Sequence, residues 1–259
     1  MKKLKKDDWN LDWLKSRSVR FIWKILSSHG ATVYFVGGCV RDTVQGRTIK
    51  DIDIATDALP SKVIELVQTA GLKVVKTGFS HGSVKVMVHQ ECFEVTTFRS
   101  DLVSDGRHSK VSFSGNILDD ASRRDFTMNA IYMTIDGDIL DPLKGWEDLV
   151  NGYVRFIGKP EKRIKEDFLR ILRYFRFVSM YDGSNENLEQ SIVNVCTDSI
   201  SGLKTLSPNR VWEELQKILL ATDPYPVLKV MKSSQILDEI LPETNVECLD
   251  RFLKIEKKL

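Results

Sequence analysis

The stretch GGCVRDTVQGRTIKDIDIAT, residues 37–56, decides the fold of this chain. It begins on Gly37 and Gly38, directly after the β-rich run TVYFV, and it ends in KDIDIAT, a second β-rich run. Between these runs, CVRDTVQ leads to Gly46, which is typical of a short helix that ends on glycine. The stretch therefore predicts a strand, a glycine turn, a helix and a second strand in immediate succession.

Two carboxylates lie in the second β-rich run. Asp51 and Asp53 are separated by one residue, so the two-residue period of a strand places both side chains on the same face. Like charges this close repel unless a cation joins them, and oxygen ligands suit Mg²⁺. Such a pair also occurs on ordinary solvated strands, so by itself it leaves both interpretations open. Glu94, in the run FEVTTF, fits either a third acidic group near the metal ions or an ordinary strand residue.

The glycines upstream of the carboxylates favour a functional interpretation. Gly37 and Gly38 allow the backbone to approach a phosphate closely, and the start of the following helix offers free N–H groups. Arg41, one turn further, adds a donor that can bind phosphate with two hydrogen bonds. We therefore expect the first element to bind a triphosphate and the second to supply ligands for its metal ions.

The flanking sequence predicts an α/β layer followed by a helical region. Residues 18–30 have apolar positions at helical spacing, and residues 60–71 place Pro60 in a first helical turn and Gly71 just past the end. The runs KVVKT, SVKVMVH and CFEVTTF are β-rich, which gives a mixed layer of about five strands. From residue 116 onward the pattern is mainly helical.

Composition excludes several classes of protein. The 259 residues are 42% hydrophobic and 29% charged, as in globular proteins, which excludes wholesale disorder. No apolar run approaches the roughly 18 residues of a membrane helix, and the basic start lacks the apolar part of a signal peptide. We therefore expect a cytoplasmic protein without membrane contact. The dispersed cysteines and histidines argue against a zinc site, and the net charge of +2 gives no independent indication of nucleic acid.

Two later segments carry clustered charges. DDASRRDFTMNAIYM, residues 119–133, predicts a helix-like stretch with Asp125 and Asn129 on one face, although adjacent arginines and an acid also fit a salt-bridged surface. In KEDFLRILRYFRF, Asp167 and Arg170 lie about 60° apart around a helix, where they form either an ordinary ion pair or a shared binding site. An acceptor beside a donor complements the Watson–Crick edge that cytosine and adenine have in common.

These motifs together resemble a known family. GGCVRD and KDIDIAT resemble the nucleotidyltransferase motif of the DNA polymerase β superfamily, and more narrowly that of class II tRNA nucleotidyltransferases, the CCA-adding enzymes, and of bacterial poly(A) polymerases. FEVTTFRSD, SDGRHSKVSF, DDASRRDFTMNAIYM, LDPLKGWEDLVNGYVRFIG and KEDFLRILRYFRF resemble further motifs in the same order. The resemblance implies an α/β head of polymerase β type, followed by an all-helical neck and a partial helical body.

The resemblance also implies roles for individual residues. Asp51 and Asp53 would be the catalytic residues and would hold two Mg²⁺ ions. Arg124 would bind the triphosphate, and Asp167 with Arg170 would read the base. The residues expected to bind the nucleotide are Gly37, Gly38, Arg41, Arg124, Asp125, Asn129, Asp167, Arg170, Arg173 and Arg176. The last two drift further around the helix, so phosphate or neck contacts are expected of them.

The implied activity is template-independent addition of C, C and A to tRNA 3′ ends from CTP and ATP. Residues 101–112 predict a polar surface loop that contains the segment DGR. The resemblance implies that this loop helps to switch specificity from C to A and that its presence favours addition of all three nucleotides. A poly(A) polymerase and an enzyme that adds only CC or only A are the enzymatic alternatives. The alternative of another class is a noncatalytic RNA-binding scaffold, against which the intact Asp51 and Asp53 argue.

We expect four segments along the chain. They are an N-terminal helix at 1–30, the nucleotidyltransferase head at 31–148, a helical neck with the base-recognition helix at 149–215, and a partial, RNA-binding body at 216–259. Oligomeric state does not follow from the sequence.

Overall fold

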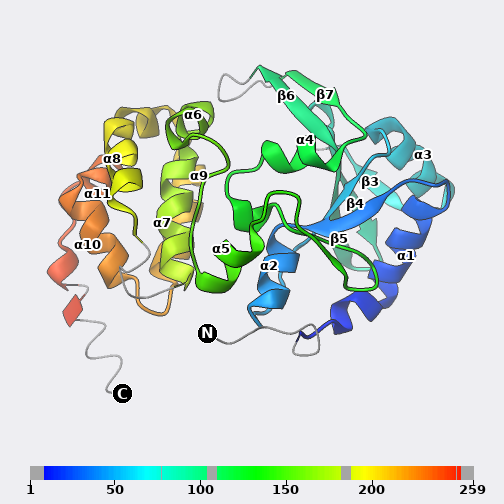
Figure 1. Ribbon diagram of the computed structural model, residues 1–259, viewed down its shortest axis with the longest axis horizontal. Helices are drawn as coiled ribbons and strands as arrows, with labels where there is room; N and C mark the ends of the chain where they lie inside the picture. Colours follow the sequence, from blue (N-terminus) through cyan, green and yellow to red (C-terminus); the bar gives the residue numbers. More distant parts are fainter. Residues whose placement is uncertain (1–8, 77, 104–109, 182–187, 249, 252–259) are drawn as a thin grey trace. The chain divides into compact units, whose positions relative to one another are not determined.

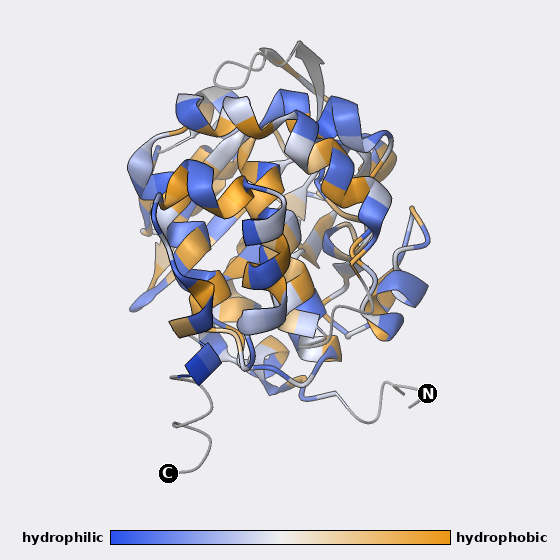
Figure 2. Cartoon of the chain, turned by 90° about the vertical axis from the view of Figure 1, so that its left-hand side faces the viewer, coloured by the Kyte–Doolittle hydropathy of each residue, from blue (hydrophilic) through white to orange (hydrophobic). Residues whose placement is uncertain are grey.

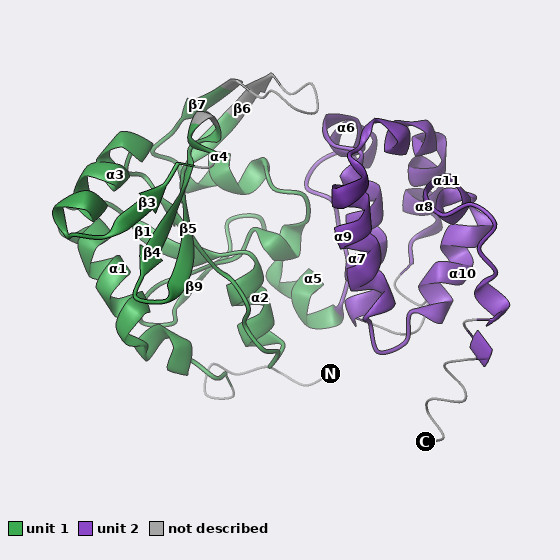
Figure 3. Ribbon diagram, turned by 180° about the vertical axis from the view of Figure 1, so that it is seen from behind, with its two compact units in different colours: residues 1–104, 108–151 green, residues 105–107, 152–259 purple. Residues whose placement is uncertain are grey.

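The computed structural model describes residues 9–76, 78–103, 110–181, 188–248 and 250–251 (Figure 1). These form two compact units, one made of the described residues up to Asn151 and the other of those from Gly152 onward (Figure 3). Unit 1 is an α/β layer, and the described elements of unit 2 are helices. The predicted fold class, an α/β head followed by a helical part, is confirmed.

A mixed seven-stranded sheet forms the centre of unit 1. Its strands lie in the order β3-β4-β5-β2-β1-β8-β9, and β6 pairs with β7 in a separate ribbon. β2 pairs antiparallel with β1 and parallel with β5, so it lies inside the sheet with a neighbour on each side. The strands are β1 (Val33–Val36), β2 (Ile52–Thr56), β3 (Lys73–Val75), β4 (Ser83–Val88), β5 (Glu91–Thr97), β6 (Arg99–Val103), β7 (Lys110–Phe113), β8 (Tyr132–Met133) and β9 (Ile139–Leu140).

The sheet has more strands than the five predicted. The predicted β-rich runs correspond to β1 through β5. The additional strands β8 and β9 are two residues long each, which is too short to show an alternating pattern. β8 also lies at the end of the segment 119–133 that was predicted to be helix-like.

Helices α1 and α3 pack against each other and against strands of the sheet. α1 begins where the Ser16 hydroxyl accepts a hydrogen bond from the Val19 amide at 3.2 Å, and Val19, Ile22 and Leu26 are buried at helical spacing. The helices of unit 1 are η2 (Asp12–Lys15), α1 (Arg17–Ser27), α2 (Gly38–Val44), α3 (Pro60–Thr69), η3 (Phe79–His81), α4 (Ile117–Ser122), η4 (Thr127–Asn129) and α5 (Trp146–Asn151).

Helices α7 and α9 pack against each other in unit 2. The helices that face the viewer in Figure 2 carry both hydrophobic and hydrophilic residues, and Ile171, Leu172 and Phe175 of α7 are fully buried. The helices are α6 (Pro160–Glu166), α7 (Leu169–Tyr181), α8 (Gln190–Asp198), η6 (Ile200–Thr205), α9 (Pro208–Leu219), α10 (Tyr225–Ser233) and α11 (Ile236–Ile240). No described helix is long and apolar enough to cross a membrane.

Two predictions stay open at this level. Residues 104–109 of the predicted polar loop lie outside the described residues. The finer division of the chain into segments 1–30, 31–148, 149–215 and 216–259 stays a prediction.

Candidate active site

Asp53 lies at the centre of the sheet, beside a second carboxylate. It is the second residue of β2, opposite Val36 on β1 and Glu94 on β5. Asp51 comes just before the strand and is exposed, whereas Asp53 is partly buried. Burial, and next the charge of Glu94, raises the pKa of Asp53 to about 6, against the opposing charge of Arg124. Three acidic groups therefore crowd this end of β2.

Gly37 forms the turn that faces these carboxylates. Its φ of 72° lies in the left-handed region, which glycine adopts without steric cost, and α2 begins at the next residue. A Cβ at Gly37 would lie 3.5 Å from Nη1 of Arg124 and 3.8 Å from Oδ2 of Asp53. The predicted glycine turn is confirmed, and it brings Gly37 and Asp53 together with Arg124 from a later stretch of the chain.

The partners of Arg41 in unit 1 include Asp42 and Asn129. Its Nε and Nη2 atoms donate to the two oxygens of Asp42 at 3.0 and 3.1 Å, and its Nη1 donates to Oδ1 of Asn129 at 2.9 Å. Asn129 in turn donates from Nδ2 to Oδ1 of Asp125 at 2.9 Å. Arg41, Asp125 and Asn129, predicted separately, thus form one buried chain of hydrogen bonds.

Asp120 orients Arg124 from inside the protein. This carboxylate has no exposed surface; its Oδ2 accepts from Nη2 of Arg124 at 2.9 Å and from the hydroxyl of Tyr132 at 2.7 Å. Its Oδ1 accepts from Nη2 of Arg123 at 2.5 Å. Burial alone would raise the pKa of Asp120, but the charges of Arg124 and Arg123 outweigh burial and lower it to about 2. Asp120 thereby binds one edge of the Arg124 guanidinium, while Nη1 faces the Gly37 turn.

The helix expected around Arg124 is absent. α4 ends at Ser122, and the chain then passes through a turn and the short η4 before β8. Asp125 and Asn129 do meet, as predicted, but the turn brings them together rather than one helix face. The turn is fixed because Gly145 approaches it so closely that a Cβ there would lie 2.3 Å from the Thr127 carbonyl oxygen. Tertiary packing here overrides the helical pattern of the sequence.

Asp167 lies at a break between two helices in unit 2. α6 ends at Glu166 and α7 begins at Leu169, and Asp167 itself is extended, with φ −156° and ψ 108°. The prediction that Asp167 and Arg170 lie 60° apart on one helix is therefore wrong. The hydrogen bond from the Leu169 amide to Oδ1 of Asp167, at 3.1 Å, explains the break because it begins a new helix.

Each member of the predicted base-recognition pair has a partner of its own. Asp167 accepts from Nη2 of Arg210 in α9 at 2.8 Å. Arg170 donates from Nη1 to Oε2 of Glu166 and to the Arg163 carbonyl oxygen, both at 2.7 Å. The alternative of an Asp167–Arg170 ion pair is not among the interactions of the described residues.

The two later arginines of α7 lie against Glu214 of α9. Nε of Arg176 is 3.1 Å from Oε2 of Glu214, and Nη1 of Arg173 is 3.9 Å from Oε1. The side chains of Arg176 and Glu214 are 10% and 5% exposed, which fits the predicted neck contact for Arg176. Arg173, at 30%, keeps more contact with solvent.

The carboxylates at β2 fit divalent cations in part. Among the described residues no group of three or more His, Cys, Asp or Glu side chains is arranged to hold a metal ion. Asp51, Asp53 and Glu94 nevertheless gather negative charge at one strand end; Arg124 and Arg41 oppose this charge, and a cation would reduce the remaining repulsion. Proteins usually bind Mg²⁺ through one or two carboxylates, and phosphate oxygens and water complete its coordination shell.

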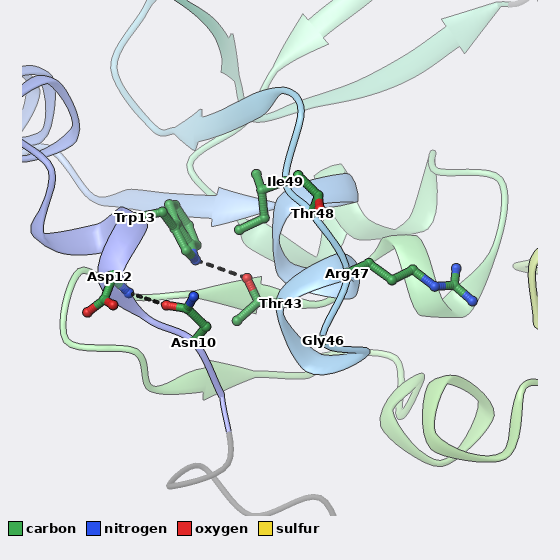
Figure 4. A pocket seen from close by; sticks show the side chains of 8 residues that line it. All are labelled: Asn10, Asp12, Trp13, Thr43, Gly46, Arg47, Thr48 and Ile49. Carbon is green, nitrogen blue, oxygen red and sulfur yellow. Dashed lines mark hydrogen bonds between the residues drawn. The ribbon is translucent and has the colours of Figure 1, made fainter.

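A pocket of about 380 Å³ lies between residues 10–13 and 43–49 of unit 1 (Figure 4). Its wall includes Trp13, whose Nε1 donates to the Thr43 hydroxyl at 3.0 Å. None of the predicted site residues lines this pocket. The predicted site residues thus lie outside this pocket.

The sequence did not point to the residues that bind the predicted site residues. Asp120, Asp42, Glu166 and Arg210 were not singled out. The spacing of Asp120 from Arg123 and Arg124, three and four residues, was a usable indication because such pairs are neighbours on a helix. Arg210 had no such indication, since it is forty-three residues from Asp167.

Comparison with known proteins agrees with this geometry. Residues 33–155 match the family described as "Poly A polymerase head domain", and residues 187–248 match "Probable RNA and SrmB- binding site of polymerase A". The chain is 37% identical over 224 residues to human CCA tRNA nucleotidyltransferase 1, mitochondrial, covering 86% of this chain and 51% of that protein. It is 38% identical over 222 residues to the CCA-adding enzyme of Bacillus subtilis, covering 85% and 54%.

The chain is similar to class II CCA-adding enzymes and to bacterial poly(A) polymerases in both of its units. The fold agrees, because the Bacillus stearothermophilus CCA-adding enzyme in complex with CTP superimposes with a TM-score of 0.71 at 35% identity. That superposition covers 85% of this chain and 52% of the other. The resemblance to CCA-adding enzymes predicted from the sequence is confirmed.

The match to the CCA-adding enzymes extends over both units but not over the relatives' whole length. The chain spans about half the length of the curated relatives it matches. The region that matches the head domain, residues 33–155, contains Asp51, Asp53 and Arg124. Asp167 and Arg170 lie between the two matched regions.

Proposed function

We propose that this chain carries the catalytic part of a template-independent tRNA nucleotidyltransferase, which adds C, C and A to tRNA 3′ ends from CTP and ATP. The observation that supports this proposal most is the meeting of Asp53, Gly37 and Arg124 at the end of β2. Carboxylates for a cation, a glycine turn for a phosphate and an arginine whose Nη1 lies beside that turn are the parts that nucleotidyl transfer requires.

In the proposed reaction the 3′-hydroxyl oxygen of the RNA attacks the α-phosphorus of the nucleotide. A phosphodiester bond forms, the α–β phosphoanhydride bond breaks, pyrophosphate leaves, and the hydroxyl proton passes to water. Two Mg²⁺ ions held by Asp51 and Asp53 would lower the pKa of the 3′-hydroxyl and stabilise the leaving pyrophosphate.

The chain's own residues bind and orient the triphosphate. Gly37 and Gly38 leave room for phosphate oxygens beside the backbone, and Nη1 of Arg124 faces that space. Because Asp120 fixes the opposite edge of the guanidinium, Arg124 needs no reorientation when negative charge develops. The chain from Arg41 through Asn129 to Asp125 supports the same turn and supplies the proposed sugar or phosphate contacts.

Base selection is assigned to unit 2. We propose that Asp167 accepts a hydrogen bond from the exocyclic amino group and that Arg170 donates to the neighbouring ring nitrogen. Cytosine and adenine both offer this pattern, whereas uracil and guanine present the reverse. Arg173 is assigned to phosphate, and Arg176, which Glu214 binds, to the packing of α7 on α9.

The decisive experiment is incubation of the chain with tRNA lacking its last three nucleotides, with each labelled nucleoside triphosphate singly and together. Addition of C, C and a single A supports the proposal. Repeated A addition from ATP alone would indicate the poly(A) polymerase alternative, and CC alone or A alone a partial enzyme. No addition would leave the RNA-binding scaffold. A cytoplasmic location also stays a prediction, which cell fractionation tests.

A further inference from the structure

The carboxylate of Asp167 is fixed from two sides. Its Oδ1 accepts from the Leu169 amide at 3.1 Å, which begins α7, and its Oδ2 accepts from Nη2 of Arg210 at 2.8 Å. The backbone of Asp167 is extended rather than helical, so the residue lies between α6 and α7 and inside neither helix. Arg210 is thus the side chain that sets the direction of the free lone pairs of Asp167.

The Asp167–Arg210 pair is open to solvent. The side chains of Arg210 and Asp167 are 41% and 27% exposed, in contrast to the nearby Arg176–Glu214 pair with 10% and 5%. An exposed ion pair contributes little to folding stability. It is accessible to a ligand, however, and a bound base beside it would exclude water from the pair.

We propose that Arg210 is a positioning residue for base selection, an inference that rests on the proposed function. By binding Oδ2, Arg210 holds the carboxylate of Asp167 in one orientation. In that orientation the carboxylate accepts a hydrogen bond from an exocyclic amino group and repels a carbonyl oxygen. Without Arg210, the Leu169 amide alone holds the carboxylate, Oδ2 loses its fixed direction, and discrimination falls for CTP and ATP against UTP and GTP.

The position of Arg210 also determines which nucleotides an Asp167→Ala variant misincorporates. When Asp167 is replaced by alanine, the N–H groups of Arg210 lose their acceptor while remaining beside the base edge. Such donors complement the carbonyl oxygens of uracil and guanine. Misincorporation by an Asp167→Ala variant therefore depends on Arg210, and a further Arg210→Ala substitution reduces it.

The test uses the full chain, tRNA lacking its last three nucleotides, and kcat and KM for each of the four nucleoside triphosphates. Arg210→Ala lowers the ratio of kcat/KM for CTP over UTP about tenfold, as expected for loss of one charge-assisted contact. Arg210→Lys, which keeps a donor for Oδ2, restores the ratio to within about threefold. Arg210→Gln replaces Arg210→Ala if the latter does not fold.

Lys204→Ala is the matched control. It removes another ion pair of unit 2, between Lys204 and Glu239 at 3.1 Å, and leaves the nucleotide ratio unchanged. A purely structural role would lower the rate equally for all four nucleotides, and that result overturns the inference. An unchanged ratio in Arg210→Ala also overturns it. A parent chain that adds no nucleotide overturns the proposed function itself, which keeps the two failures distinct.

Discussion

The aromatic ring of Phe168 occupies the space that Gly202 leaves empty. A Cβ at Gly202 would lie 2.1 Å from Cδ1 of the ring, far inside van der Waals contact. Phe168 separates Asp167 from Leu169, so this contact between η6 and the helix break fixes the backbone beside the residue proposed for base selection.

Replacing Gly202 with alanine should therefore displace Phe168. We expect a loss of about 1–3 kcal/mol in the free energy of unfolding, because the added methyl overpacks the site. Urea denaturation measures this loss. Gly115→Ala is the control, since a Cβ at Gly115 meets nothing within 4 Å. Equal stability of the Gly202→Ala and Gly115→Ala variants would contradict the contact, and Gly202→Ala should cost less when Phe168 is already replaced by alanine.

Substitution of the β2 carboxylates should abolish nucleotide addition and preserve the fold. Asp51→Ala and Asp53→Asn should each leave below roughly 1% of the parent rate, because each removes a metal ligand rather than a core group. Chelation of divalent ions should stop the parent, and added Mg²⁺ should restore it. Labelled CTP incorporation and circular dichroism measure the two effects. Glu91→Gln, an exposed carboxylate of β5, is the control, and substantial activity in Asp53→Asn would refute the metal assignment.

The buried carboxylate of Asp120 should make the free energy of unfolding depend on pH in the acid range. Its folded pKa of about 2 lies below its usual value of 3.8, so the stabilisation is complete above about pH 4. It is lost as the pH falls through about 2, and it amounts to roughly 2 kcal/mol. Urea midpoints from pH 7 to pH 2 should show this slope, which Asp120→Asn should remove. A parent-like slope in Asp120→Asn would disprove it, and the exposed Asp136→Asn should keep the parent's behaviour.

The polar segment 101–112 gives a prediction about the last nucleotide. If it adjusts the recognition pair from C to A, a short Gly-Ser linker in its place should preserve CC addition and remove the terminal A. Product lengths on sequencing gels distinguish these steps. Equal loss of C and A addition would instead assign the segment a general role in substrate binding.

Local patterns predicted the elements that are long or bounded by glycine. Strands β1 through β5, helices α1 and α3, and the Gly37 turn follow from periodicity and backbone preference, because these act within a few residues. The turn after α4 could not be predicted, since it depends on contact between Gly145 and Thr127, eighteen positions apart. β8 and β9 could not be predicted because strands of two residues are defined by pairing with neighbouring strands and not by a local pattern.

The site residues followed a similar rule. Asp51, Asp53, Gly37 and Arg41 lie in one stretch, so spacing alone related them. The break at Asp167 was hidden because Leu169 through Arg176 continue a helical pattern without a proline or glycine to mark the start of a new helix. Its partner Arg210 depends on how α9 packs against α7, which no single segment of sequence encodes.

The position of β8 has a consequence for synthesis of the chain on the ribosome. β1 gains its second neighbour only when Phe35 and Val36 pair with Met133 and Tyr132. A nascent chain that has emerged only as far as β5 therefore exposes one edge of β1, which is a template for pairing with other chains. The segment that covers this edge follows directly on Arg124 and Asn129. A growing unit 1 thus gains its protected edge and its proposed triphosphate site in the same step, and bound nucleotide would indicate that the edge is covered.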